Sequence, residues 1–282
     1  KEVYMGYIAS LFGYVLNFLY NLVNNYGIAI ILFSILLRII LLPITIKQQK
    51  TMIKTTKLQS KMKEIQFKYK NNPERLNQET MNLYKQENLS PFSGCFSMII
   101  QFIVILSVFY MVSSPLTYMK KIDKSVIDEY KSKISAEGNT NSAYQEIAII
   151  NRYSNEDEQL KINMGFLGID LSMVPKDHLN DFKVYIIPGL YVISSFISIR
   201  ITTKKQSKMQ NKLLEAGNKE NESNEIDTMQ QMNKNMNYMM PIISISIALV
   251  APLGLALYWL ISNILMTAER IVIEKVVKEE EA

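Results

Sequence analysis

The strongest constraint on this chain is an apolar run at residues 28–46, IAIILFSILLRIILLPITI. Its 19 residues contain a single charge, Arg38, and a single proline, Pro43. A helix rises 1.5 Å per residue, so about 20 apolar residues cross the roughly 30 Å hydrocarbon core of a bilayer. The run therefore predicts a membrane-spanning helix.

The distribution of charge extends this prediction to the whole chain. A content of 48% hydrophobic residues also fits a globular protein, but here charges crowd into some windows and leave others empty. Apolar windows recur at 96–114, 184–199, 239–251 and 253–273. The windows at 184–199 and 239–251 are short, and undersized helices thin the bilayer around them. We therefore predict an all-α integral membrane protein with five short transmembrane helices.

Residues 1–26 have a different pattern. Ser10, Gly13, Asn17, Asn21 and Asn24 recur every three or four residues and form one polar stripe, with apolar residues mostly on the other side. An amphipathic helix lying in the membrane interface explains this stripe. A sixth span is the alternative interpretation.

Loop charge gives an orientation. Residues 47–95 hold ten Lys or Arg against four acids, 200–237 hold seven against five, and 116–183 hold nine against eleven. Basic loops stay in the cytoplasm, which predicts an external N-terminus and a cytoplasmic C-terminus. The predicted order is an external interfacial helix 1–26, span 27–46, cytoplasmic hairpin 47–95, span 96–115, external loop subdomain 116–183, span 184–200, cytoplasmic loop 201–238, two spans within 239–273 and a cytoplasmic tail 274–282.

The first cytoplasmic loop is predicted to be a helical hairpin. Apolar residues from Leu58 to Tyr69 recur at helical spacing, and Asn71-Asn72-Pro73 marks a turn, with Pro73 placed to begin the second helix. Its basic face fits either anionic lipid headgroups or a docking partner, such as ribosomal RNA, and these interpretations are compatible. The basic residues are Lys54, Lys57, Lys61, Lys63, Lys68 and Lys70. The external loop, by contrast, fits two short helices and indicates no chemistry.

Arg38 is the most informative residue. It is the eleventh of 19 residues in its span, where a lipid-facing guanidinium costs between about 3 and 17 kcal/mol. The first four spans contain no Asp or Glu, and the fifth has only Glu269 near its end. Arg38 then either caps backbone carbonyls of a neighbouring helix or faces a hydrophilic groove open to one side. Polar residues of the spans that fit a groove are Ser34, Gln101, Ser194, Ser198, Trp259, Ser262 and Asn263.

Several classes of function are disfavoured. One cysteine, Cys95, excludes an internal disulfide and a cysteine-based zinc cage, and one histidine, His178, lies in the external loop. No Gly-rich phosphate loop or metal-ligand cluster occurs, so we expect neither an enzyme nor a cofactor or metal. The lack of intramembrane carboxylates disfavours a proton-coupled transporter, and a single arginine disfavours a voltage sensor.

Five segments carry a resemblance. They are YGIAIILFSILLRIILLPITIKQQKTM, KLQSKMKEIQFKYKNNPERLNQE, LYKQENLSPFSGC with the following IIQF, NMNYMMPIIS and APLGLALYWLISN. These segments resemble the YidC family of membrane protein insertases, and the short chain resembles its five-span bacterial branch. Ser97 and Ile103 stand where the family often has proline, and the external loop is longer than in short members. A lipid-modified N-terminal cysteine, common in this branch, is not in the sequence.

The resemblance implies a mechanism. The family has a groove open to cytoplasm and lipid and closed outside, and its positive residue matches Arg38. The groove draws a polar, often acidic, external segment of a substrate into the membrane without nucleotide hydrolysis, and the hairpin receives the substrate. The implied location is the bacterial plasma membrane, and the implied partners are nascent membrane proteins, anionic lipids, and the ribosome and Sec translocon. A small-molecule channel or transporter, or an assembly chaperone acting only with the Sec translocon, remains an alternative.

A closed outer face also has a sequence requirement. A continuous aqueous pore would leak ions, so the outer halves of the spans should form an apolar plug. Residues 28–33, 105–111 and 250–257 are the segments expected to form it.

Overall fold

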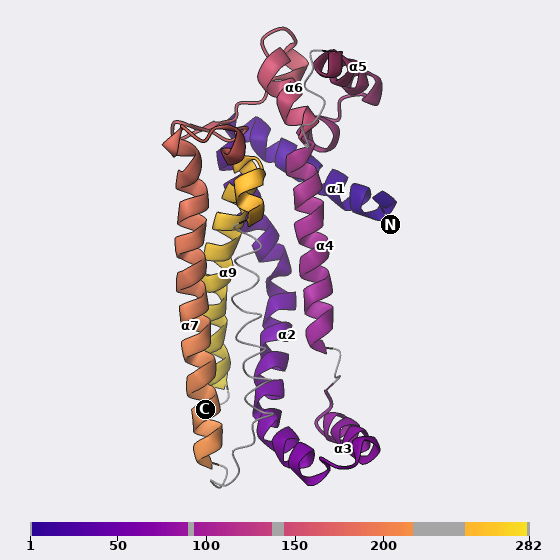
Figure 1. Cartoon of the computed structure of the whole chain (residues 1–282), viewed down its shortest axis with the longest axis vertical. Coiled ribbons are helices and arrows are strands. Elements are labelled where there is room, and N and C mark those ends of the chain that lie inside the picture. Colours follow the sequence, from indigo (N-terminus) through magenta and orange to yellow (C-terminus); the bar gives the residue numbers. More distant parts are fainter. Residues whose placement is uncertain (1, 90–92, 137–143, 217–245, 281–282) are drawn as a thin grey trace. The chain divides into compact units, whose positions relative to one another are not determined.

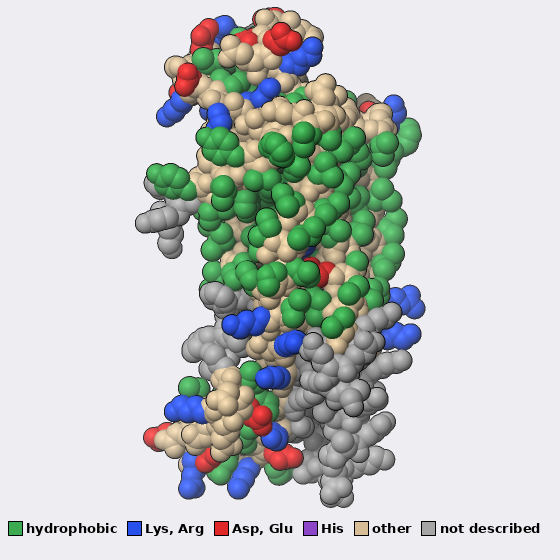
Figure 2. All heavy atoms as spheres, turned by 180° about the vertical axis from the view of Figure 1, so that it is seen from behind, with side chains coloured by type: hydrophobic (Ala, Val, Ile, Leu, Met, Phe, Trp, Pro, Cys, Tyr) green, Lys and Arg blue, Asp and Glu red, His purple; other side chains and the backbone are tan. Residues whose placement is uncertain are grey.

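The computed structural model describes residues 2–89, 93–136, 144–216 and 246–280 (Figure 1). The chain divides into two compact units. Unit 1 comprises residues 1–39, 101–194 and 243–265, and unit 2 comprises residues 40–100, 195–242 and 266–282. In Figure 2, charged side chains gather over the α5–α6 region of unit 1 and over the α2–α3 hairpin of unit 2, whereas hydrophobic side chains cover the apolar helices.

Four described helical segments are long and apolar enough to cross a membrane: Met5–Val23, Tyr26–Thr51, Phe182–Ile201 and Leu253–Ile273. A shorter apolar segment runs from Ile99 to Ser113. The protein is therefore a mostly helical membrane protein. Residues 239–245 of the predicted span at 239–251 lie outside the described residues. Within the rest of that span, residues 246–250 are helical. The segment Met5–Val23 meets the same criteria of length and composition, although its sequence pattern favours an interfacial helix.

The first two helices meet at a sharp turn. α1 runs Glu2–Val23, and Asn24 follows in the left-handed region with φ 49°. The Asn25 side chain then accepts a hydrogen bond from the Ile28 amide at 3.0 Å, which satisfies one free N–H at the start of α2, Tyr26–Lys68. α2 is one helix of 43 residues that continues through Pro43, so it carries both the predicted first span and the first arm of the hairpin.

The other elements of unit 1 surround the polar loop. α4, Ser93–Ser113, leads into a π-helix at Leu116–Lys120, and two short helices follow, α5 Lys124–Ala136 and α6 Gln145–Tyr153. The expected pair of helices is thus present in the loop. Smaller elements that the sequence did not indicate are three 3-10 turns and a two-stranded antiparallel sheet: Glu158–Leu160, Pro175–Asp177, Phe182–Tyr185, β1 Gly165–Phe166 and β2 Ile169–Asp170.

Two long helices complete the described chain, α7 Ile186–Ala216 and α9 Leu253–Glu280. The core of unit 1 lies where the helix ends meet the loop. Its largest fully buried side chains are Leu16, Tyr26, Ile30, Met111, Leu116, Met119, Ile149, Ile150, Leu160, Leu171, Leu253 and Leu255. These residues come from α1, α2, α4, α6, α9 and the loop, so one apolar cluster ties the loop to the helices.

Unit 2 contains the predicted hairpin. α3 runs Pro73–Gln86, and its first turn is capped by the Asn72 side chain, which accepts a hydrogen bond from the Arg75 amide. The expected turn and the start of the second helix at Pro73 are therefore confirmed. Leu58 of α2 and Leu83 of α3 are buried, with exposed fractions of 4% and 7%, so each arm of the hairpin buries an apolar side chain.

Candidate functional site

Arg38 lies in the middle of the apolar part of α2 and is half-buried. Within the described part of the chain, no hydrogen bond or ion pair reaches its guanidinium. On α9 of unit 1, the Tyr258 hydroxyl lies within electrostatic range of Arg38 and hydrogen-bonds with Ser262. Tyr258 and Ser262 are one helical turn apart and both buried. The Tyr258 hydroxyl on α9 therefore lies near a cation that has no carboxylate partner among the described residues of this unit.

A second polar cluster joins α9 to α7. The Asn263 side-chain amide donates to Ser194 Oγ at 3.0 Å, and Ser194 Oγ donates to the Tyr191 carbonyl at 2.8 Å. The Trp259 ring lies 6.2 Å from the Tyr191 ring, centroid to centroid. Interhelical hydrogen bonds of this kind hold membrane helices together, so these residues pair the two helices whatever else they contact.

The remaining predicted groove residues lie apart from these clusters. Ser34 is 1% exposed, and its hydroxyl donates to the Ile30 carbonyl of its own helix at 2.7 Å. Gln101 is half-buried on α4. In unit 2, Ser198 Oγ accepts a hydrogen bond from Thr267 Oγ1 at 2.8 Å. The structure thus pairs Ser194 with Asn263, and it does not bring all the predicted residues into one described contact network.

The sequence pattern missed Tyr258 and Thr267. Both lie in the apolar window 253–273, where a tyrosine or threonine does not interrupt the hydrophobic pattern. The available signal was spacing, because Tyr258 lies four residues before Ser262 and therefore on the same helical face.

Glu269 is the other residue whose environment the sequence did not indicate. Both oxygens of its carboxylate are buried and have no hydrogen-bond partner within the described residues. A buried carboxylate without a partner is costly, so this position is either strained or functional.

The three predicted plug segments are partly buried in unit 1. Nine apolar residues of α2, α4 and α9 within the three predicted plug segments have exposed fractions of 2% or less: Ala29, Ile30, Phe33, Val108, Met111, Leu253, Leu255, Ala256 and Leu257. Ile28, Tyr110 and Val250 of the same segments are instead 41%, 36% and 42% exposed. Part of each predicted plug segment is therefore buried, and the plug itself stays a prediction.

A loop segment fastens helix ends in this part of unit 1. The Asn163 carbonyl accepts from the Tyr26 amide at 3.0 Å, and the Asn25 side chain donates to the Gly165 carbonyl at 2.7 Å. At the other end of the segment, the Leu253 amide donates to the Met173 carbonyl and the Gly254 amide donates to the Leu171 carbonyl, both at 2.9 Å. Residues 163–173, called the strap below, thus satisfy free amides at the first turns of α2 and α9.

The basic residues of the hairpin are mostly exposed. Lys54, Lys68 and Lys70 face solvent, and Lys61 pairs with Glu87 at 2.8 Å. The Lys68 ammonium lies 5.5 Å from the centre of the Tyr69 ring. The side chains of Lys57 and Lys63 lie outside the described residues.

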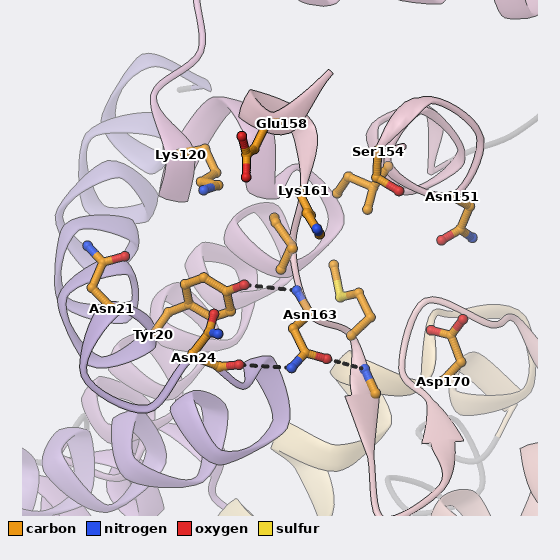
Figure 3. Close-up of a pocket in the computed structure, with 14 residues that line it drawn as sticks. Tyr20, Asn21, Asn24, Lys120, Asn151, Ser154, Glu158, Lys161, Asn163 and Asp170 are labelled. Atoms are coloured by element: carbon orange, nitrogen blue, oxygen red, sulfur yellow. Dashed lines mark hydrogen bonds between the residues drawn. The ribbon is translucent and has the colours of Figure 1, made fainter. Parts of the chain in front are cut away.

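A cavity of about 790 Å³ lies elsewhere in unit 1, between the end of α1 and the loop (Figure 3). Asn163 organises its floor, because its amide donates to the Tyr20 hydroxyl and its side chain donates to the Asn24 carbonyl, both at 2.9 Å. Side chains of both signs line it: Lys120, Lys161, Glu158 and Asp170. None of the predicted groove residues lines this cavity, and its mixed charges do not favour a ligand of one sign.

Comparison with known proteins decides the family. The family model described as 60Kd inner membrane protein matches residues 18–280. The chain belongs to the YidC/Oxa1 family of membrane protein insertases. The YidC resemblance of the sequence is therefore confirmed. Membership also confirms that the chain is a multi-pass membrane protein and falls in a family that is not enzymatic.

Relatives named membrane protein insertase YidC match at different lengths. The protein of Treponema denticola is 27% identical over 277 residues, which is 97% of this chain and 39% of the relative. The protein of Caldanaerobacter subterraneus subsp. tengcongensis is 40% identical over 107 residues, 38% of this chain and 52% of the relative. The protein of Syntrophus aciditrophicus is 50% identical over 94 residues, 33% of this chain and 17% of the relative. These matches therefore cover about half or less of each relative.

Proposed function

We propose that this YidC-family chain inserts membrane proteins by drawing polar external segments of its substrates into a positively charged hydrophilic groove. The groove opens to the cytoplasm and to lipid, and no nucleotide is hydrolysed. The observation that carries the proposal is Arg38, a half-buried guanidinium in mid-span without a hydrogen bond or ion pair to the described residues. A cation that faces lipid in this position is costly, so its presence favours a hydrated surface.

Arg38 can lower the cost of moving an acidic segment. Two unit charges attract by about 4 kcal/mol at 4 Å in a surrounding of intermediate polarity, whereas water reduces this to about 1 kcal/mol. A cation in a partly dehydrated groove therefore stabilises a transient carboxylate more than bulk solvent would. We propose that Ser262 lines the groove together with Tyr258, whose hydroxyl lies near Arg38. We propose that the other lining groups are Ser34, Gln101, Ser194, Ser198, Trp259 and Asn263.

A closed outer face favours a groove over a channel. The side chains of Ile30, Met111 and Leu255, in the three predicted plug segments, are fully buried, which supports a closed outer face. Hydrophobic constrictions stop conduction by excluding water. A substrate segment therefore enters from the open end only part of the way, and the hydrophobicity of its own span completes insertion. The short spans proposed here would assist by thinning the bilayer.

We propose five spans, with the N-terminus outside, the C-terminus in the cytoplasm and α1 in the outer interface of a bacterial plasma membrane. Within unit 1, α1 crosses α4 rather than running beside it (Figure 1). One row of α1 is buried against the unit, including Ala9 and Leu16 at 0% exposure. The opposite row is apolar and 61–70% exposed, and consists of Tyr7, Leu11, Tyr14, Phe18 and Leu22. An exposed apolar row on a crossing helix favours contact with lipid at the interface.

The hairpin is proposed to receive nascent membrane proteins. Its exposed lysines also suit anionic lipids, and a ribosome or Sec translocon docked there would deliver the substrate. Phe67 is 61% exposed and Met81 is 44% exposed, so the hairpin offers apolar surface beside its charges. Exposed methionine and aromatic side chains adapt to variable apolar partners.

Reconstitution tests the proposal. The purified chain is placed in liposomes that contain no other protein, and a single-span substrate with an acidic external segment is added. We expect the external segment to become protected from protease, with protein-free liposomes as the background. Ion flux is recorded on the same liposomes. Conduction without insertion would support a channel, and insertion that requires added translocon would support an assembly chaperone. Either result would overturn the proposal.

A further inference from the structure

The turn of the strap is unusual in both backbone and side chain. β1 and β2 pair through Gly165 with Asp170 and Phe166 with Ile169, which leaves Leu167 and Gly168 as the two residues of the turn. Leu167 has φ 50° and Gly168 has φ 77°, both in the left-handed region. Such turns favour Asn, Asp and Gly, and leucine is an uncommon residue there. The Leu167 side chain is also 87% exposed.

The strap is held firmly despite its exposed tip. Its hydrogen bonds to Asn25, Tyr26, Leu253 and Gly254 fix it at both ends. The Phe166 ring lies so close to Gly27 that a Cβ there would stand 2.5 Å from it. Tyr26 and Leu253 are also the first residues of two candidate spans. The strap therefore lies at the membrane boundary of these helices.

Exposed apolar residues continue from the strap region into α7. Leu179 is 70% exposed and Phe182 is 73% exposed, and both precede the helix. Phe182 is followed at spacings of four, four and three by exposed residues of the α7 span: Ile186, Leu190 and Ile193. Ile186, Leu190 and Ile193 share one face of α7, and the exposed Phe182 in the 3-10 turn just before it extends an apolar surface suited to lipid. Lys176 and Lys183 are exposed in the same segment, beside the acids Asp177 and Asp181, and a polar segment with lysine and aromatic residues next to a span suits a membrane interface.

We propose that the strap turn and the residues before α7 anchor the protein in the adjacent lipid leaflet. Leu167, Leu179 and Phe182 enter the boundary between headgroups and acyl chains, and Lys176 and Lys183 meet the lipid phosphates. Lipid is the occupant, rather than a second copy of the chain, because Phe182 directly precedes α7 and its exposed apolar face, and α7 carries a candidate span. This inference goes beyond the proposed function and does not depend on insertion of substrates.

A fluorescent probe of local polarity tests the anchor. Cys95 is replaced by serine, and a single cysteine is placed at Leu167 and labelled with a polarity-sensitive dye in protein reconstituted into vesicles of phosphatidylcholine and phosphatidylglycerol. Leu179→Cys repeats the test outside the tight turn. The matched control is Ser132→Cys, on the exposed side of α5. We expect blue-shifted emission at positions 167 and 179, quenched by lipids brominated near the headgroup and shielded from aqueous iodide, with the reverse at position 132.

Each other result overturns the proposal. Iodide quenching at positions 167 and 179 equal to that at position 132 would place the patch in water. Blue-shifted emission without quenching by brominated lipid would show that protein covers the patch instead. In that case, loss of the shift on dilution into excess lipid would identify a second copy of the chain.

Discussion

Gly13 provides a sensitive test of how α1 is held. A Cβ added at this position would lie 1.8 Å from the Tyr118 carbonyl oxygen and 2.4 Å from its carbonyl carbon. Ordinary contact begins near 3.4 Å, so α1 would have to move away by about 1.6 Å. The neighbouring bond from Lys121 Nζ to Ser10 Oγ, now 2.7 Å, would lengthen beyond hydrogen-bonding range.

The expected cost follows from these contacts. Overpacking against a backbone that cannot yield costs about 1–3 kcal/mol, and a hydrogen bond to a charged group contributes about 1.5–3 kcal/mol. Replacing a helical glycine with alanine returns roughly 0.5–1 kcal/mol. Gly13→Ala should therefore lower the free energy of unfolding by about 2–4 kcal/mol, because part of each contact survives relaxation.

Two glycines serve as controls. At Gly6 the added Cβ would meet only the Tyr118 hydroxyl at 3.8 Å, and at Gly189 nothing lies within 4 Å. Alanine at either position should leave stability unchanged or raise it by up to about 1 kcal/mol. Thermal unfolding in detergent, with amide hydrogen exchange along α1, measures all three variants. Equal stability of Gly13→Ala and Gly6→Ala would refute the close packing of α1 on the π-helix.

Three further predictions concern single side chains. Burial raises the pKa of Glu146, so the folded protein keeps this proton to higher pH than the unfolded chain. The free energy of unfolding should therefore fall as the pH rises from the ordinary carboxyl pKa to the raised one, and Glu146→Gln should remove that pH dependence. Asn25→Ala should lower the free energy of unfolding by about 1 kcal/mol for the lost cap of α2, and further for the lost hydrogen bond to the Gly165 carbonyl of the strap. Asn25→Asp should keep the cap, so equal thermal stability of the two variants would contradict these roles. Glu269→Gln should raise the melting temperature because it removes a buried carboxylate that has no partner among the described residues. Glu64→Gln, at an exposed position, should have no effect, and a lower melting temperature for Glu269→Gln would contradict the prediction.

The sequence predicted those features that repeat along the chain. Apolar windows identified the long helices, and the proline at position 73 located the start of α3, because proline is favoured in the first turn. Family membership also followed from the sequence, since several long segments carry it. The continuous α2 was not foreseen, because the change from apolar to basic residues near Lys47 marks the end of a membrane segment and not the end of a helix.

Short and tertiary features could not be read in this way. β1 and β2 have two residues each, too few for an alternating pattern. The strap forms most of its hydrogen bonds to α2 and α9 through backbone groups, which leave no pattern in the sequence. At the candidate site the residue types were informative, but their pairing depends on how each helix is rotated. Asn263 contacts Ser194, whereas Ser34 bonds within its own helix, although both were expected in one groove.

The charge of Arg38 is tested most directly by comparing Arg38→Lys and Arg38→Ala for insertion and thermal stability, with Arg200→Ala as the control at an exposed arginine. The substrate is an acidic-tailed, single-span protein that depends on this chain, and a matched substrate with a neutral tail is run beside it. We predict that Arg38→Lys keeps much of the activity, because the positive charge remains although the planar guanidinium is lost. Arg38→Ala should lose insertion of the acidic substrate with little loss of stability. Normal insertion of the acidic substrate by Arg38→Ala would contradict the account, as would a destabilised Arg38→Ala that lysine does not rescue.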